Sequence, residues 1–434
     1  METKQFQKWL NSYSVKMVVV SVLALFLLIP SFLIQDIIKE RMQMKLLVEE
    51  QLKQQWGASQ VVSGPVLNVP VTYFVSKDNQ QGVTEHKTTV HILPEWLNIN
   101  VEMIPEIRYR GIYKMPVYES KMKIKGAFSK TDFSKMGIEE SQLRMDDAYF
   151  TMGITDLRGI TDSVSILVNQ STTAVEPGVS DNDLFQSGIT FKPASLDTNQ
   201  TIDFEIDLRL RGSASFSLEA LGKTTEIEMH SSWANPSFTG SFLPSNRDVN
   251  DDGFSASWLV THLNRNFPQQ WTGNKHSTSD SQLGVSLLMP VDHYQKATRS
   301  AKYAILFIAL NFIVFLFIEI KNKKRIHPFQ YALVAFALLL FYTLLTSIGE
   351  QIGFNAAFVI SALAITALIS WYSYTILGAI KSTLWVTSLQ LGLYLFLFTI
   401  IQLQDYALLM GSIGLFIILG LIMKASQQIK WYSE

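Results

Sequence analysis

The 434-residue chain contains no cysteine. This absence excludes disulfide bonds, cysteine-ligated metal sites and thiol catalysis together. The chain also lacks an excess of charge of either sign, because 36 Lys and Arg stand against 37 Asp and Glu, for a net charge of −1. A near-neutral chain gives no electrostatic reason to expect nucleic acid as a partner. No HExxH, GxSxG, Walker or dinucleotide-binding motif occurs, so the sequence indicates no catalytic residue, no cofactor site and no enzyme activity.

Histidine is scarce and dispersed, with seven residues in the whole chain. His86 and His91 share one β-rich segment, but their odd spacing points them to opposite faces of a strand. The sequence therefore predicts no metal site that is built on histidine. The stretch Asp248–Gly253 resembles the first half of a calcium loop, yet Leu259 stands where the bidentate Glu is expected. An ordinary turn is the alternative, since Asp, Asn and Gly also form turns.

Ionisable residues are absent from the middles of six long apolar runs, each of about 18 residues or more and so long enough to cross a hydrocarbon core. Ion-coupled transporters usually carry such groups inside the membrane, so their absence argues against a proton-coupled pump. Asn311 and Gln390 lie within runs, and we expect a hydrogen bond between helices there rather than a substrate contact. The runs cover residues 15–34, 301–318, 329–348, 354–374, 384–401 and 406–423.

The first run has a signal peptide as its alternative, because a basic start and an apolar core fit both. We predict an uncleaved anchor over residues 1–34, since the run exceeds a typical signal core and no small-x-small cleavage site follows it. Residues 35–59 then show apolar residues at helical spacing and predict a stalk helix.

The basic residues between the runs predict the orientation. Lys321, Lys323, Lys324 and Arg325 fall in one loop, and further lysines lie in the next alternate loop and in the tail. The charged residues of the other short loops are acidic, and these loops contain no Lys or Arg. Since Lys and Arg collect on the cytoplasmic side, both termini are predicted to be cytoplasmic and residues 35–300 to lie outside.

Residues 60–300 are polar and carry period-two alternation with regular turn signals, one of them the segment 76–82. The prediction is an antiparallel, sandwich-like β-rich domain between the first and second spans, whose last strand runs to Tyr294. The polar stretch 172–183 is the candidate boundary between two halves. Asp156 and Arg158 are expected to pair across an exposed turn. Trp233, Pro236, Phe238 and Pro244 are expected to be core, with an exposed docking patch as the alternative.

Several distinctive stretches occur in order along nearly the whole chain. They include GPVLNVP (Gly64–Pro70), RGIYKMPVY (Arg110–Tyr118), DLRGI (Asp156–Ile160), LRGSASFSLEALGK (within Leu210–Pro244), GFSASW (Gly253–Trp258), LNRNFPQ (Leu263–Gln269) and the segments Gly284–Phe312 and Arg325–Phe354. Together these stretches resemble the CreD family of inner-membrane proteins. The resemblance implies the inner membrane of a Gram-negative bacterium, residues 35–300 in the periplasm, and a role in envelope integrity that is linked to colicin tolerance and to a two-component carbon-source response. It implies no reaction.

Three functions are compatible with this pattern. The first is a non-enzymatic envelope protein that acts through contacts with membrane lipid and with an envelope protein, lipid or cell-wall partner. The second is a transporter or lipid-handling protein that passes an amphiphile between the β-rich domain and the membrane bundle. The third, a membrane-anchored hydrolase, lacks a nucleophile and base. An apolar groove would favour the second, and a closed sandwich with an exposed apolar patch the first. The oligomeric state stays open.

Overall fold

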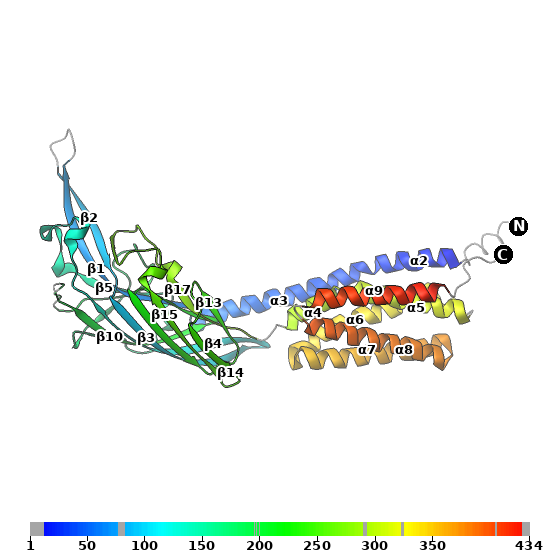
Figure 1. Cartoon of the computed structure of the whole chain (residues 1–434). Coiled ribbons are helices and arrows are strands. Elements are labelled where there is room, and N and C mark those ends of the chain that lie inside the picture. The colour runs from blue at the N-terminus through cyan, green and yellow to red at the C-terminus, as the bar shows by residue number, and fades with distance from the viewer. Residues whose placement is uncertain are drawn as a thin grey trace. The chain divides into compact units, whose positions relative to one another are not determined.

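The computed structural model describes residues 13–76, 83–194, 196, 198, 200–289, 293–322, 325–403 and 406–427 (Figure 1). The chain divides into two compact units, which we call the helical unit (Met1–Leu46 with Val291–Glu434) and the β-rich unit (Leu47–Pro290). The turn predicted around residues 76–82, apart from Ser76, and the orienting residues Lys323 and Lys324 lie outside the described residues.

The helical unit confirms a bundle of six apolar spans. Within the described residues, six helical segments are long and apolar enough to cross a membrane: Lys16–Trp56, Ala304–Asn322, Pro328–Ile352, Phe354–Leu377, Ile380–Gln402 and Ala407–Lys424. The helices that form them are α2 (Tyr13–Phe26), α3 (Leu28–Trp56), α5 (Ala304–Asn322), α6 (Pro328–Ile352), α7 (Phe354–Leu377), α8 (Ile380–Gln402) and α9 (Ala407–Ser426).

Aromatic packing holds α6, α7 and α8 together. The Phe341 ring on α6 lies 5.3 Å from that of Phe358 on α7 and 4.6 Å from that of Tyr394 on α8, measured between ring centroids. The hydrogen bond expected between spans is present, since Asn311 Nδ2 on α5 donates to Gln390 Oε1 on α8 at 3.0 Å. Both residues are fully buried, so the bond satisfies one polar atom of each amide that lipid could not.

The strand predicted to run to Tyr294 is shorter than expected. β17 (Gln282–Leu287) ends at Leu287, and the helix α4 (His293–Ala301) begins six residues later. Tyr294, Ala297 and Ala301 are buried at helical spacing on one face of α4. The prediction of a strand is wrong here because the polar residues between these three point away from the buried face. A short apolar run does not distinguish the period of a strand from that of a helix.

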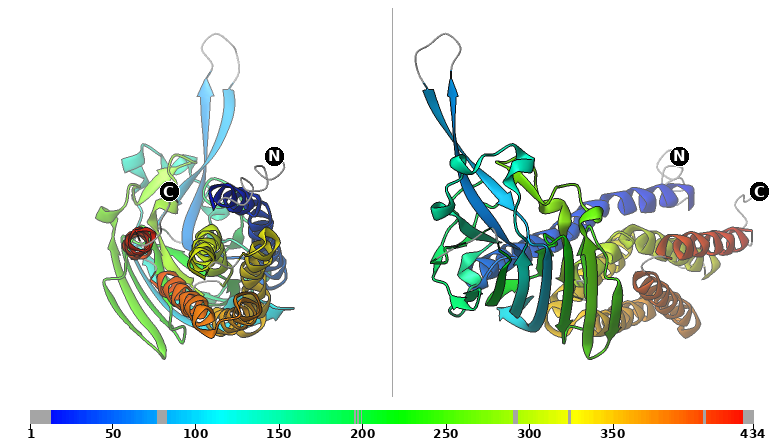
Figure 2. Two further views of the ribbon diagram at one scale, coloured as in Figure 1. Left: turned by 90° about the vertical axis from the view of Figure 1, so that its right-hand side faces the viewer. Right: turned by 60° about the vertical axis from the view of Figure 1, so that its left-hand side comes forward.

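The β-rich unit is a sandwich of two sheets (Figures 1 and 2). The A sheet has the order β13-β17-β11-β1-β5-β9-β8, with β2 paired to β1 and β16 paired to β2. Its strands are β1 (Gln60–Ser76), β2 (Val83–Ile92), β5 (Tyr149–Ile154), β8 (Val175–Pro177), β9 (Gly188–Phe191), β11 (Ser215–Glu219), β13 (Pro236–Gly240), β16 (Gln270–Thr272) and β17. In Figure 2 the β1–β2 hairpin projects beyond the rest of this unit.

The B sheet has the order β14-β15-β12-β3-β4-β10-β6-β7. Most pairings are antiparallel, as predicted, but β1 with β11 and β3 with β12 are parallel. Strands from both sides of residues 172–183 contribute to both sheets, and the β-rich unit is one compact body. The strands are β3 (Trp96–Arg110), β4 (Tyr113–Phe128), β6 (Ser165–Val168), β7 (Ser171–Thr172), β10 (Ile202–Ser213), β12 (Thr224–Ser231), β14 (Asn246–Asn250) and β15 (Gly253–Thr261).

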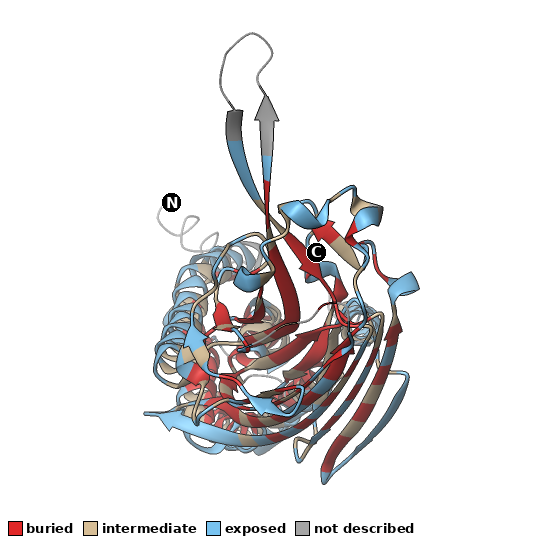
Figure 3. Cartoon of the chain, turned by 90° about the vertical axis from the view of Figure 1, so that its left-hand side faces the viewer, coloured by how far each residue is buried: buried red, intermediate tan, exposed pale blue. Residues whose placement is uncertain are grey.

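Alternation of side chains builds one continuous core between the sheets (Figure 3). On β3, Leu97, Ile99, Val101 and Met103 are buried, while the residues between them face outward. Large aromatic side chains fill the centre, among them Tyr118, Phe128, Phe150, Phe191 and Phe216, each less than 2% exposed. The sandwich is therefore closed and packed rather than an open barrel around a ligand.

The aromatic stretch after β12 lies at the edge of this core. The four residues expected to be core are only half-buried: Trp233, Pro236, Phe238 and Pro244. Trp233 and Phe238 pack against the core from its edge, and the fully buried tryptophan nearby is Trp258 on β15. Phe238 on β13 packs edge-on against Trp258, with 5.9 Å between centroids. β13 is an edge strand that begins with Pro236, a position where proline removes no ladder hydrogen bond.

Candidate functional site

Three polar side chains lie side by side on the face of the A sheet that points away from the main core. The register pairs His91 of β2 with Asn68 of β1, and Asn68 in turn with Tyr149 of β5. The imidazole of His91 is 0% exposed and Asn68 is 2% exposed. A buried row of this kind must find hydrogen-bond partners, because unpaired polar groups are costly there.

Hydrogen bonds fix the orientation of the His91 ring. The Nδ2 group of Asn68 donates to Thr151 Oγ1 at 2.9 Å and to Val66 O at 3.2 Å. Its Oδ1 is therefore left to accept, and it lies 2.7 Å from Nδ1 of His91. Nδ1 of His91 thus carries the proton, and the lone pair of Nε2 points away from the Asn68 side.

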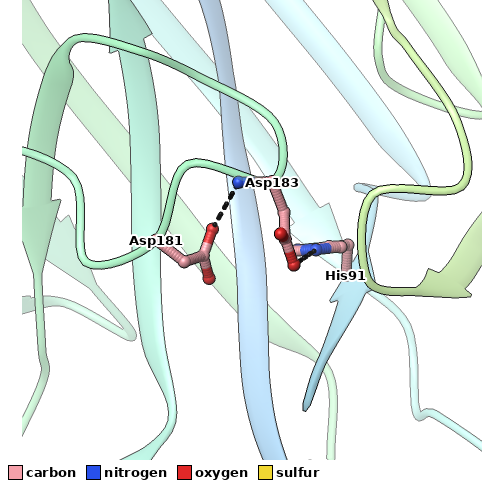
Figure 4. Close-up of side chains that lie close together, drawn as sticks. All are labelled: His91, Asp181 and Asp183. Atoms are coloured by element: carbon pink, nitrogen blue, oxygen red, sulfur yellow. Dashed lines mark hydrogen bonds and ion pairs between the residues drawn. The ribbon is translucent and has the colours of Figure 1, made fainter.

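Two carboxylates from the loop between β8 and β9 complete the group (Figure 4). Asp183 Oδ2 lies 3.4 Å from His91 Nε2. Asp181 accepts a hydrogen bond from the Tyr149 hydroxyl at 2.6 Å and another from the Asp183 backbone N–H at 3.3 Å. One ligand-type atom from each of the three residues lies within 4.8 Å of the others. The group is the only such His and carboxylate cluster found among the described residues, and it could hold a metal ion.

Burial sets the protonation of the site. Loss of hydration lowers the pKa of His91, against the opposing effect of Asp181 and Asp183, so the neutral imidazole is favoured. Burial and the neighbouring Asp181 carboxylate raise the pKa of Tyr149, which keeps its hydroxyl a donor. The site combines a neutral nitrogen acceptor with carboxylate acceptors.

A small apolar cluster covers the same face and positions the loop. Phe185 follows the two aspartates and is buried with Val66, Leu93, Leu221, Phe267 and Trp271. The Trp271 ring also packs on the His91 ring, with 5.8 Å between centroids. The loop is therefore anchored by its apolar residues next to the carboxylates.

A second polar network fastens the last turn of α3 within the β-rich unit. The Trp56 ring lies between the guanidinium groups of Arg108, at 4.4 Å, and Arg211, at 4.6 Å. Asp156 Oδ2 accepts from the Ala58 N–H at 3.0 Å. We call this network the stalk joint.

Asp156 and Arg158 form the centre of the stalk joint. Arg158 Nε donates to Asp156 Oδ1 at 2.9 Å and its Nη2 donates to Oδ2 at 2.8 Å, which confirms the expected pairing. The prediction of an exposed turn is wrong for Asp156, which is buried, whereas Arg158 is exposed. Arg158 Nη1 also donates to the Gln54 carbonyl on α3, at 2.9 Å. Gly159 allows the turn to pack closely here, because an added Cβ would collide with the Arg211 carbonyl oxygen. The DLRGI and LRGSAS stretches thus build the joint.

The β3–β4 hairpin presents apolar residues to solvent. Burial alternates along β3 only as far as Met103. Beyond it Ile107 is 38%, Tyr109 68% and Ile112 39% exposed. Arg108, Arg110 and Lys114 stand among them. We call residues 104–114 the hairpin tip.

Other residues singled out in the sequence lie apart from these sites. Asp248–Gly253 forms the turn between β14 and β15, in which Asn250 pairs with Gly253 and Asp252 N–H bonds Asn250 Oδ1 at 2.9 Å. Its side chains are exposed, so the stretch is an ordinary hairpin turn. Lys321 lies in the last turn of α5 and is exposed. Glu319, two residues earlier, is buried and pairs with Lys16 of α2 and the Tyr331 hydroxyl.

Sequence reasoning missed the His91 cluster. The sequence compares His91 only with His86, which is exposed on the opposite face as expected. It gives no reason to pair His91 with carboxylates far along the chain. The one local signal is a histidine inside the apolar run Val90–Leu93, where it must be buried and paired. Its partners could not be named without the sheet register.

The chain matches known proteins along most of its length. The family model described as "Inner membrane protein CreD" matches residues 12–432. The protein named "Inner membrane protein CreD" from Escherichia coli (strain K12) is 29% identical over 413 residues, which cover 94% of this chain and 91% of that protein.

Proposed function

The chain belongs to the CreD family of inner membrane proteins, and on that premise we propose that it contributes to cell-envelope integrity through non-enzymatic contacts of its β-rich unit. In this proposal both termini are cytoplasmic and residues 35–300 are periplasmic. The partner we favour is the lipid surface itself. The proposal assigns no reaction to the chain.

The observation that carries the proposal is a closed sandwich with an exposed apolar tip. The core between the sheets is filled by buried apolar side chains that pack on one another. A groove of about 690 Å³ on the outer face of the B sheet is lined largely by polar and charged residues, including Glu102, Lys121, Lys123, Asp207 and Arg209. Such a lining suits water rather than an acyl chain, so it does not support lipid transport.

The hairpin tip has the composition of a membrane-interface element. Tyr109, Ile107 and Ile112 offer apolar surface, and the exposed residues Arg110 and Lys114 offer positive charge to anionic headgroups. Arg108 stacks on Trp56 at the end of α3, at 4.4 Å from the ring centroid, and this contact anchors the hairpin tip within the β-rich unit.

The absence of cysteine allows a direct test with single labels. A nitroxide attached to Ile112→Cys in proteoliposomes is expected to be accessible to oxygen dissolved in lipid. A label on Leu263→Cys, a residue that is 83% exposed elsewhere in the β-rich unit, is expected to be accessible to water-soluble nickel reagents instead. Water accessibility at both positions would contradict the lipid contact.

A cellular assay tests the envelope role separately. In a strain that lacks the gene, a Tyr109→Asp/Ile112→Asp variant is expected to fail to restore resistance to detergent and colicin, whereas Leu263→Asp restores it. Protein levels in the membrane are compared by immunoblot. Full complementation by the hairpin variant at an equal level would refute the proposed role of the tip.

A further inference from the structure

We propose that His91, Asp181 and Asp183 bind one divalent transition-metal ion, of the Zn²⁺ or Mn²⁺ class, that clasps the β8–β9 loop to β2. This site is separate from the hairpin tip and does not depend on the envelope function proposed above. Its ligands would be Nε2 of the histidine and one oxygen of each carboxylate.

The geometry fits a metal better than it fits direct contacts. Two ligands at about 2.1 Å from a tetrahedral metal lie about 3.4 Å apart. His91 Nε2 and Asp183 Oδ2 are separated by 3.4 Å, which is longer than a charge-assisted hydrogen bond. The third ligand atom, from Asp181, lies within 4.8 Å of both, a separation that small side-chain rotations can shorten.

The hydrogen-bond pattern leaves the site with acceptors only. Nδ1 of His91 is engaged by Asn68, and Nε2 has no hydrogen-bond partner although it is completely buried. Its lone pair faces the Asp183 carboxylate, which is also an acceptor. A cation between them satisfies both, whereas without one a nitrogen lone pair and an anion oppose each other.

The ligand set selects the class of metal. Imidazole nitrogen suits Zn²⁺ and other transition ions, while carboxylates also suit Mn²⁺, so this mixed set disfavours Ca²⁺ and Mg²⁺, which prefer oxygen alone. The second shell is also present. Asn68 orients the histidine, and the Tyr149 hydroxyl at 2.6 Å orients Asp181, as outer groups do in metal sites. Three protein ligands leave a position for water.

Such an ion would cross-link segments that lie far apart in the sequence. His91 belongs to β2, and the two aspartates belong to the loop between β8 and β9. Bonds of this kind stabilise the folded form, because the ligand set does not exist in the unfolded chain. The loop would then be held by the ion at Asp181 and Asp183 and by the apolar cluster at Phe185.

The test uses the full-length protein in detergent, purified without a polyhistidine tag and stripped with a chelator. Zn²⁺ or Mn²⁺ is added alone, excess is removed, and bound metal is measured by mass spectrometry. We expect one ion per wild-type chain. His91→Asn and Asp183→Asn are each expected to bind at least about 100-fold more weakly, more than the effect of losing an outer-shell group.

Two matched variants control for non-specific binding and for folding. His86→Asn removes an exposed histidine from the opposite face of β2, and Asp252→Asn removes an exposed carboxylate from the β14–β15 turn; both should bind as the wild type does. Because the Asp183 side chain is 33% exposed, Asp183→Asn should fold normally. The metal at 100 times its Kd should raise the wild-type Tm by about 5–10 °C and leave that of Asp183→Asn unchanged.

The proposal is overturned if the wild type binds neither ion, or if Asp183→Asn binds as tightly as the wild type. Binding that persists in His91→Asn would also overturn it, because the site would then be a carboxylate cluster without the histidine.

Discussion

At the scale of single residues, Asp156 illustrates how one carboxylate can serve several donors. It accepts from Ala58 N–H and from the Arg158 guanidinium, and these bonds, that from Arg158 above all, hold the pKa of Asp156 below its ordinary value of 3.8. A folded-state pKa below the unfolded one means that the carboxylate stabilises the protein above the unfolded pKa. That stability is lost as the pH falls toward the folded pKa.

Asp156→Asn is therefore expected to destabilise the β-rich unit at pH 7 by about 1–3 kcal/mol, the cost of breaking a buried charge-assisted bond. The penalty should shrink as the pH falls below about 4. Chemical denaturation, followed by circular dichroism at pH 7 and at lower pH, measures the loss of stability and its dependence on pH. Asp162→Asn, which removes an exposed pair with Arg209, should change stability by less than about 0.5 kcal/mol. A penalty that is independent of pH would contradict the role of the charge.

At the scale of elements, the contact between α5 and α8 includes one buried polar pair. Asn311 Nδ2 donates to Gln390 Oε1 and to the Phe307 carbonyl, so one polar atom of each amide has its partner inside the bundle. Hydrogen bonds between membrane helices are modest because polar groups also find partners in the unfolded state. Their main consequence is therefore the choice of helix faces.

A double-mutant cycle with Asn311→Leu and Gln390→Leu is expected to give a coupling energy of about 0.6 kcal/mol, with about 1.7 kcal/mol as the upper bound. Unfolding in mixed micelles provides the four stabilities. Ser412→Ala on α9 is the control, since its hydroxyl bonds only the Leu409 carbonyl of its own helix. Coupling between Asn311 and Ser412 as large as that between Asn311 and Gln390 would show that the cycle reports a general change in the stability of the bundle rather than this hydrogen bond.

At the scale of the whole molecule, the charge distribution predicts the topology. Lys321 and Arg325, with Lys323 and Lys324 between them, form the basic loop after the second span. Green fluorescent protein fused after Glu434 is expected to fluoresce in the cytoplasm, and alkaline phosphatase inserted after Val179 is expected to be active in the periplasm. A second insertion at Asp251, in an exposed turn, controls for disturbance of the first. Protease access to Val179 from the cytoplasmic side alone would refute the topology.

The sequence by itself determined the six spans, the position of the β-rich part between the first and second of them, and the family. These features are local. A run of apolar residues forms its backbone hydrogen bonds within one helix. A stretch such as DLRGI can be recognised without knowledge of the residues that it contacts. The Asp156–Arg158 pair could be predicted because its two residues are close in sequence. The hydrogen bond of Asn311 could be predicted because a polar side chain within the membrane must find its partner on another helix or on its own.

The tertiary structure alone decided what depends on register. The parallel pairings of β1 with β11 and of β3 with β12 join segments far apart in the chain, and alternation along one strand does not reveal its neighbour. His91, Asn68 and Tyr149 become a row only when β2, β1 and β5 are aligned, and Asp181 and Asp183 reach that row only through a loop anchored by Phe185. Strand pairing converts these scattered polar residues into a site, because it fixes which side chains share a face.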